Sequence, residues 1–158
     1  MKKMKEEKKF EFSYSYYSHQ DELTGAEQEL IKRSISEAEN AYAPYSGFHV
    51  GAAGIVSGNE IVGASNMENA AYPQCLCAEQ VLCAAVKSQF NDQPITGMAV
   101  YSPNWKNHLP LSPCGSCRQI LVEKERRQNV NLVLFLLSAS GEIWKIPSAL
   151  SLLPFGFQ

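Results

Sequence analysis

Three cysteines and one glutamate have the residue types and spacings that suggest a metal site. Cys114 and Cys117 form a C-x-x-C pair at the start of an expected helix, where side chains three residues apart share one face. A helix N-terminus favours thiolate over thiol, so the pair is suited to chelate zinc. Cys77 begins a second expected helix and offers a third thiolate. Zinc takes four ligands, and three from the protein leave one position for water, as in catalytic zinc sites.

Glu79 follows Cys77 by two residues and supplies the acid-base group that such a site needs. Within the first helical turn its carboxylate can approach a metal-bound water without binding the metal. A water that attacks a substrate must lose a proton, and the leaving group must gain one. The pattern C-x-E…P-C-x-x-C therefore indicates hydrolytic zinc chemistry, and it matches the signature of zinc deaminases.

The cysteines also permit other interpretations. A structural zinc site would need a fourth ligand, for which Cys75 is a candidate, and inert core thiols would need no metal. Cys114 and Cys117 also resemble a thioredoxin-like redox dithiol, but that interpretation leaves Glu79 without a role. Cys83 is expected to be a small buried apolar residue. Five clustered cysteines without a secretion signal argue against a disulfide framework.

Five stretches of the chain resemble, in order, the cytidine deaminases of the small homotetrameric type: AYAPYSGFHVGAA (41–53), NMENAAY (66–72), CAE (77–79), SPCGSCRQ (112–119) and LLP (152–154). The resemblance runs from about residue 24 to the C-terminus. We therefore expect a deaminase domain over 23–158 and an N-terminal extension over 1–22. The fold that it implies is α/β, a three-layer α/β/α sandwich with a mixed five-stranded sheet.

The same resemblance implies an activity and a cofactor. One Zn²⁺ per subunit is held by Cys77, Cys114 and Cys117, and cytidine and 2′-deoxycytidine are hydrolysed to uridine and 2′-deoxyuridine with release of ammonia, as in pyrimidine salvage. Glu79 protonates N3 of the base and then the leaving amine. The implied assembly is a homotetramer with shared active sites.

Residues that contact the nucleoside are implied as well. Asn66 and Glu68 match the family's sugar-binding pair. Two residues apart on an extended segment they point the same way, and an amide with a carboxylate can serve a sugar hydroxyl as donor and acceptor. Phe48 matches an aromatic residue that packs on the pyrimidine ring, and Ala78 would offer its backbone to the base edge.

Contacts across subunits are implied at Ala70 and Tyr72, which match residues lining an adjacent subunit's pocket. Phe157 matches an aromatic residue that enters a neighbour's pocket from the C-terminus. One position departs from the pattern, because Gln80 stands where this group commonly has arginine. That arginine offsets the charge of the thiolates, whereas glutamine can donate a hydrogen bond but brings no charge.

Composition excludes several other classes of protein. The net charge of −2 argues against a nucleic-acid partner, and so against deamination of polynucleotides. The longest purely apolar run, 132–137, is too short to span a bilayer. Residues 1–9 mix lysine and glutamate and no apolar stretch follows them, so we expect a solvated tail, no membrane partner and a cytoplasmic location.

The elements that must position these residues follow from periodicity and turn signals. Thr24 and Glu27 form an expected helix-capping box. Residues 10–16 alternate aromatic and polar, which predicts an extended segment covering an apolar surface. We expect helices over 25–42, 78–89, 114–127 and 148–153, a hairpin of 49–56 and 60–65 with its turn at 57–59, and strands over 97–102, 130–138 and 142–146.

Overall fold

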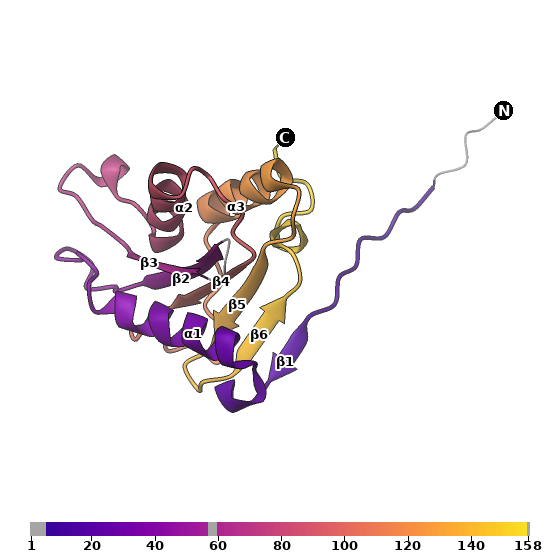
Figure 1. Cartoon of the computed structure of the whole chain (residues 1–158), viewed down its shortest axis with the longest axis horizontal. Helices are drawn as coiled ribbons and strands as arrows, with labels where there is room; N and C mark the ends of the chain where they lie inside the picture. The colour runs from indigo at the N-terminus through magenta and orange to yellow at the C-terminus, as the bar shows by residue number, and fades with distance from the viewer. Residues whose placement is uncertain (1–5, 57–59, 158) are drawn as a thin grey trace.

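A mixed six-stranded sheet forms the middle layer of the fold, and helices cover both of its faces (Figure 1). The computed structural model describes residues 6–56 and 60–157. The strands are β1 (Ser15–Tyr17), β2 (Gly51–Val56), β3 (Glu60–Ser65), β4 (Gly97–Tyr101), β5 (Val133–Leu137) and β6 (Ile143–Ile146), in the order β1-β6-β5-β4-β2-β3. β4 and β5 run parallel, and the other neighbouring pairs are antiparallel.

Within residues 6–56 and 60–157, three α-helices and three 3₁₀-helices complete the fold. The former are α1 (Gly25–Ala38), α2 (Ala78–Gln89) and α3 (Gly115–Gln128), and the latter are η1 (Gln20–Glu22), η3 (Tyr72–Gln74) and η4 (Ala149–Leu152). On one face of the sheet, the α1 residues Leu30 and Ile31 pack with Phe135 of β5. On the other face, Leu82 of α2 and Leu121 of α3 belong to the larger core cluster. None of the helices in the described part of the chain is long and apolar enough to cross a bilayer.

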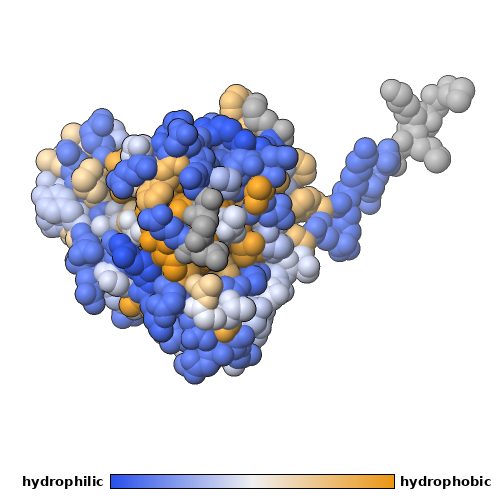
Figure 2. Space-filling model, in the orientation of Figure 1, coloured by the Kyte–Doolittle hydropathy of each residue, from blue (hydrophilic) through white to orange (hydrophobic). Residues whose placement is uncertain are grey.

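The expected number of five strands is wrong, because part of the N-terminal extension joins the sheet. β1 pairs antiparallel with β6, with Tyr16 opposite Trp144. The preceding Tyr14 stacks on the Trp144 ring with centroids 4.6 Å apart, and Tyr16 Oη donates to Glu142 at 2.7 Å. Aromatic stacking across strands stabilises such a pair. Before β1 the chain extends outward to a hydrophilic end (Figures 1 and 2), although the Phe10 ring still lies 6.5 Å from the Phe155 ring. Residues 1–5 of the expected tail lie outside the described residues.

Helix α1 begins where the sequence predicts and ends earlier. Thr24 Oγ1 accepts the Glu27 N–H, and the Glu27 carboxylate accepts the Thr24 N–H at 3.0 Å, which confirms the capping box. The helix ends at Ala38 rather than at 42 because Tyr42 pairs with another segment. Its N–H donates to Asn66 O at 3.1 Å, and its carbonyl accepts the Glu68 N–H at 2.8 Å. The predicted hairpin strands are confirmed by β2 and β3, whereas its turn at 57–59 is outside the described residues.

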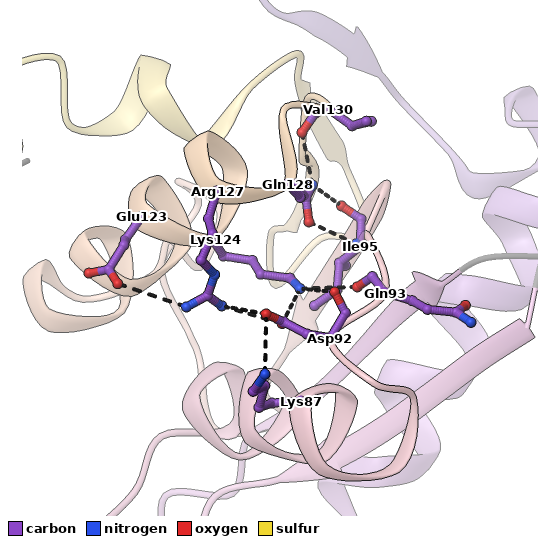
Figure 3. Close-up of polar contacts among 9 residues, drawn as sticks. All are labelled: Lys87, Asp92, Gln93, Ile95, Glu123, Lys124, Arg127, Gln128 and Val130. Carbon is purple, nitrogen blue, oxygen red and sulfur yellow. Dashed lines mark hydrogen bonds and ion pairs between the residues drawn. The ribbon is translucent and has the colours of Figure 1, made fainter.

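Lys124 of α3 and Asp92, in the loop after α2, connect these two helices (Figure 3). The Lys124 side chain is only 4% exposed, and its Nζ donates to Asp92 Oδ1 at 2.6 Å and to Gln93 O at 3.0 Å. Arg127 and Lys87 reach the same carboxylate from α3 and α2. The neighbouring Lys124 ammonium holds the pKa of Asp92 below its ordinary value. This cluster therefore fixes the loop after α2 against α3.

Replacing Asp92 with asparagine is expected to lower the free energy of unfolding by about 3 kcal/mol at pH 7, because it leaves the buried Lys124 cation without its counter-charge. Asp92 has a φ of 59°, a region that asparagine also tolerates, so the substitution tests the charge rather than the backbone. The folded-state pKa of Asp92 is depressed, so its contribution is present above the unfolded pKa of about 3.9 and is lost as pH falls through the folded value. Urea denaturation at pH 7 and pH 3 measures this difference.

Glu123→Gln is the matched control, because Glu123 is an exposed partner of Arg127 at 4.0 Å. Its effect should stay within about 0.5 kcal/mol. Two results would contradict the role assigned to the Asp92 charge. One is a loss of unfolding free energy from Asp92→Asn at pH 7 that is as small as that of the control, and the other is a loss at pH 3 that is as large as the loss at pH 7.

Candidate metal centre and adjoining cavity

The three cysteines expected to bind zinc come together at the starts of two helices. Cys77 caps α2, Cys114 caps α3, and Cys117 lies in the first turn of α3. Their sulfur atoms all lie within 4.8 Å of one another. Zinc–thiolate bonds of about 2.3 Å in tetrahedral geometry place sulfur atoms about 3.8 Å apart, so small movements would close this group on the metal. The donor set and its geometry therefore fit zinc.

A hydrogen bond between the Cys77 and Cys117 thiols changes the pKa of both groups. A hydrogen bond from Cys117 lowers the pKa of Cys77 to about 7. The pKa of Cys117 is raised well above its ordinary value by the same bond and by burial. Cys77 is thus ready to ionise near neutral pH, which suits a metal ligand. Both helix N-termini favour negative charge at this point.

Glu79 is a nearly buried carboxyl group beside this cluster. It lies in the first turn of α2, is 5% exposed, and faces a cavity that Cys77 and Cys114 also line. Burial raises its pKa above the ordinary value. A carboxyl group whose pKa moves toward neutrality accepts and releases protons more readily at physiological pH. The arrangement can therefore pass protons to and from a molecule bound in the cavity.

The cavity has a volume of about 270 Å³ and brings together most of the residues that the sequence analysis singled out. It is lined by Phe48, Asn66, Glu68, Cys77, Glu79 and Cys114, and also by Ser46, Val50, Met67, Cys75, Leu76, Val100, Leu111 and Ser112. Apolar walls with a few polar groups are typical of small-molecule sites. Of the second set, the sequence analysis considered only Cys75, as a possible fourth zinc ligand; the others are apolar and hydroxyl side chains, which carry no chemical pattern of their own at these positions.

Asn66 and Glu68 face the cavity and also brace the segment that carries Phe48. The Asn66 side chain accepts the Val50 N–H at 2.8 Å and donates to Phe48 O at 2.9 Å. Glu68 Oε2 accepts the Tyr45 N–H at 2.8 Å, and hydrogen bonds from Ser46 and Tyr45 hold the pKa of this carboxyl below its ordinary value. Glu68 therefore remains an anion at neutral pH. Both side chains have a structural role that the spacing of the sequence did not indicate.

Five expected site residues do not line this cavity, and one of them is the fully buried metal-ligand candidate Cys117. Ala78 is buried, Ala70 is exposed, and Phe157 is 85% exposed. Tyr72 is 69% exposed and lines a second cavity of about 330 Å³, together with Tyr45, Ser46, Glu68 and Cys75. The two cavities share Ser46, Glu68 and Cys75. Within one chain, Tyr72 thus lies next to the main cavity rather than in it.

The remaining cysteines differ from the three-cysteine group. Cys75 Sγ accepts the Asn69 N–H at 3.3 Å and is not part of the cluster that could hold a metal. Burial raises the pKa of the Cys83 thiol to about 11, and Cys83 packs against the core on the α2 side of the sheet. Neither contact supports a fourth cysteine ligand.

Arg118 and Gln80 support the cysteine segments, and pattern reasoning gave neither of them this role. Arg118 Nε donates to Pro113 O at 2.8 Å, and another of its nitrogens donates to Ser112 Oγ at 3.0 Å. Gln80 Nε2 donates to Ser116 Oγ at 3.1 Å. The hydrogen-bond donor of Gln80 is thus directed at a hydroxyl group.

The chain is similar to known cytidine deaminases in sequence and in structure. The family model described as "Cytidine and deoxycytidylate deaminase zinc-binding region" matches residues 24–133. A cytidine deaminase from Sporosarcina psychrophila is 34% identical over 131 residues, which are 83% of this chain and 90% of the relative. One from Halalkalibacterium halodurans is 36% identical over 96 residues, 61% of this chain and 70% of the relative. A crystal structure of the Burkholderia pseudomallei cytidine deaminase has a TM-score of 0.71 at 33% identity and covers 85% of this chain and 100% of its own.

Proposed function

Because the chain belongs to the cytidine deaminase family, we propose that it hydrolyses cytidine and 2′-deoxycytidine to uridine and 2′-deoxyuridine and releases ammonia. One observation carries the proposal: two thiols of the three-cysteine cluster and the buried carboxyl of Glu79 line a single cavity of about 270 Å³. We place the enzyme in pyrimidine salvage, in the cytoplasm, with a free nucleoside as its substrate and neither a nucleic acid nor a membrane as a partner.

The chemistry divides between the metal and Glu79. A zinc ion held by Cys77, Cys114 and Cys117 supplies Lewis acidity that lowers the pKa of water. Glu79 accepts a proton from the attacking water and gives it to N3 of the base, which makes C4 electrophilic. Glu79 then carries the second proton of the water to the amine, so that the C4–N bond breaks and ammonia leaves. In total one water is consumed, one C–O bond forms and one C–N bond breaks.

The walls of the cavity are assigned to the rest of the nucleoside. We propose that Phe48 packs on the pyrimidine ring, that the Ala78 backbone contacts the base edge, and that Asn66 and Glu68 bind the sugar hydroxyls. The anionic Glu68 carboxylate accepts hydrogen bonds and repels phosphate, which favours a nucleoside over a nucleotide. The places of Phe48, Asn66 and Glu68 in the lining of the cavity support three of these assignments.

The working unit is proposed to be a homotetramer with one zinc ion per subunit and shared active sites. Tyr72 and Phe157 are exposed aromatic side chains, and large apolar groups in water favour an interface. Ala70 and Tyr72 would then complete a neighbour's pocket, and Phe157 would enter one from the C-terminus. Gln119 prepares the tail for this role, because it accepts the Phe157 N–H at 2.9 Å and donates to Phe157 O at 2.8 Å.

Phe157→Ala is expected to raise the KM for cytidine about tenfold while zinc content and oligomeric state stay unchanged. Stacking an aromatic ring on a base contributes about 1–3 kcal/mol, and alanine removes it. Deletion of residues 157–158 should give the same increase. Steady-state kinetics at several cytidine concentrations measure it.

Phe155→Ala is the matched control, because Phe155 is equally exposed and lies two residues away. Its KM should remain close to that of the unmodified enzyme. A Phe157→Ala enzyme with an unchanged KM, or a Phe155→Ala enzyme with the larger increase, would rule out Phe157 as the residue that completes the pocket.

A panel of substrates tests the proposed function. The zinc-loaded protein is incubated with cytidine, 2′-deoxycytidine, cytidine monophosphate and a single-stranded oligodeoxycytidine, and the loss of the cytosine absorbance is followed. Turnover of the two nucleosides, with little or none of the other two compounds, is expected. Failure to turn over either nucleoside would reject the proposal. Zinc-free protein that is active in thiol–disulfide exchange would support the redox alternative for Cys114 and Cys117.

A further inference from the structure

Gln80 connects the two helices that present the cysteines, and it uses both ends of its side-chain amide. Its Oε1 accepts the Cys77 backbone N–H at 3.2 Å, and its Nε2 donates to Ser116 Oγ at 3.1 Å. Cys77 caps α2, whereas Ser116 lies in the first turn of α3. One neutral side chain thus fastens the start of one helix to the start of the other.

The sulfur cluster depends on the relative position of these two helix starts. Cys77 comes from α2, and Cys114 and Cys117 come from α3, so separation of the helices moves one ligand away from the other two. Ser116 lies in sequence between the two α3 ligands, so its hydroxyl is anchored to the same turn. Separation of the helix starts would also break the hydrogen bond between Gln80 Nε2 and Ser116 Oγ. A hydrogen bond between the helices opposes that movement.

We propose that Gln80 and Ser116 form a positioning pair that holds α2 and α3 in the arrangement that retains zinc. The inference rests on the proposed function in one respect, namely that zinc is the metal of this site. Residues that orient metal ligands commonly affect metal affinity. The pair itself touches neither the substrate nor the metal in this account; it acts through the position of Cys77 relative to Cys114 and Cys117.

Zinc release tests the pair without depending on activity. The full-length protein is loaded with zinc, and transfer of zinc to a chromogenic chelator is timed for Gln80→Ala, Ser116→Ala and the double variant. Ser116→Ala should speed release about threefold to tenfold, as expected for the loss of one hydrogen bond, and Gln80→Ala at least as much, because it also removes the acceptor of the Cys77 N–H. Both substitutions remove the bond between Gln80 and Ser116, so their effects should not multiply. The double variant should release zinc at least about threefold more slowly than the product of the two single fold-changes predicts. Ser88→Ala and Gln89→Ala, at the far end of α2, are matched controls that should release zinc at the original rate.

Three results separate this inference from the proposed function. The positioning pair is overturned, and the deaminase assignment left intact, by either of two release measurements. In one, the single variants release zinc at the original rate; in the other, their fold-changes multiply fully in the double variant. A reconstituted parent protein that retains no zinc overturns both. Zinc-loaded parent protein without turnover of cytidine overturns only the proposed function, and non-multiplying release rates would then still support the pair.

Discussion

Glu79→Gln is expected to keep its zinc and its fold while turnover of cytidine falls by a factor of at least about 10²–10⁴. Glutamine has nearly the same shape as glutamate but cannot carry a proton. In the proposed reaction Glu79 moves protons from water to N3 and then to the amine, so one substitution blocks several transfers. Glu79 lies in the first turn of α2 and faces the cavity beside Cys77. The other carboxylate in the described lining, Glu68, accepts hydrogen bonds from the Tyr45 and Ser46 backbone.

The control for this substitution is Glu39→Gln, at the exposed end of α1, which should have unchanged kinetics. Zinc content and the thermal midpoint are measured on the same samples, so that loss of metal is separated from loss of chemistry. Glu79→Gln with turnover near that of the parent enzyme would show that the proposed proton route is incorrect.

Cys117→Ala is expected to lose its zinc, and turnover should fall with it by at least about 10²-fold. The substitution leaves two protein ligands in place of three, and zinc sites with a water position need three. Cys117 is fully buried in the first turn of α3, where alanine is a good helix former, so the helix itself should be retained. Metal analysis after dialysis and circular dichroism measure the two effects separately.

Cys83→Ala is the matched control because Cys83 also lies on a helix near the core but packs against apolar residues. It should keep zinc and turnover. If instead Cys117→Ala keeps a full complement of zinc, or Cys83→Ala loses it, the ligand set assigned to the site is wrong.

The site was more predictable from the sequence than the outer parts of the fold. The spacings of Cys77, Glu79, Cys114 and Cys117 carry their own chemistry, and α2 begins and ends at the predicted residues. The end of α1 was predicted too late, because the pairing of Tyr42 with the segment at Asn66 and Glu68 is a tertiary contact. Helical periodicity gives no information about such a partner.

The sixth strand and the bracing roles were not predictable for a related reason. Alternation in residues 10–16 indicated an extended segment, but its partner β6 lies more than a hundred residues away in the chain. The amide of Asn66 is used to hold the backbone of Phe48 and Val50, and residue type alone does not say which groups an amide will bind. Residues expected to act across subunits, such as Tyr72 and Phe157, have their proposed partners in another chain.

In the proposed function, deamination of cytidine requires a zinc ion at the three cysteines. The most direct test strips the metal with a chelator, returns zinc in steps, and measures uridine and ammonia formed at each ratio of zinc to chain. We expect no turnover without zinc, a linear rise that ends at about one zinc per chain, and equal amounts of uridine and ammonia. Full turnover by the stripped protein, or zinc-saturated protein that leaves cytidine unchanged, would contradict it.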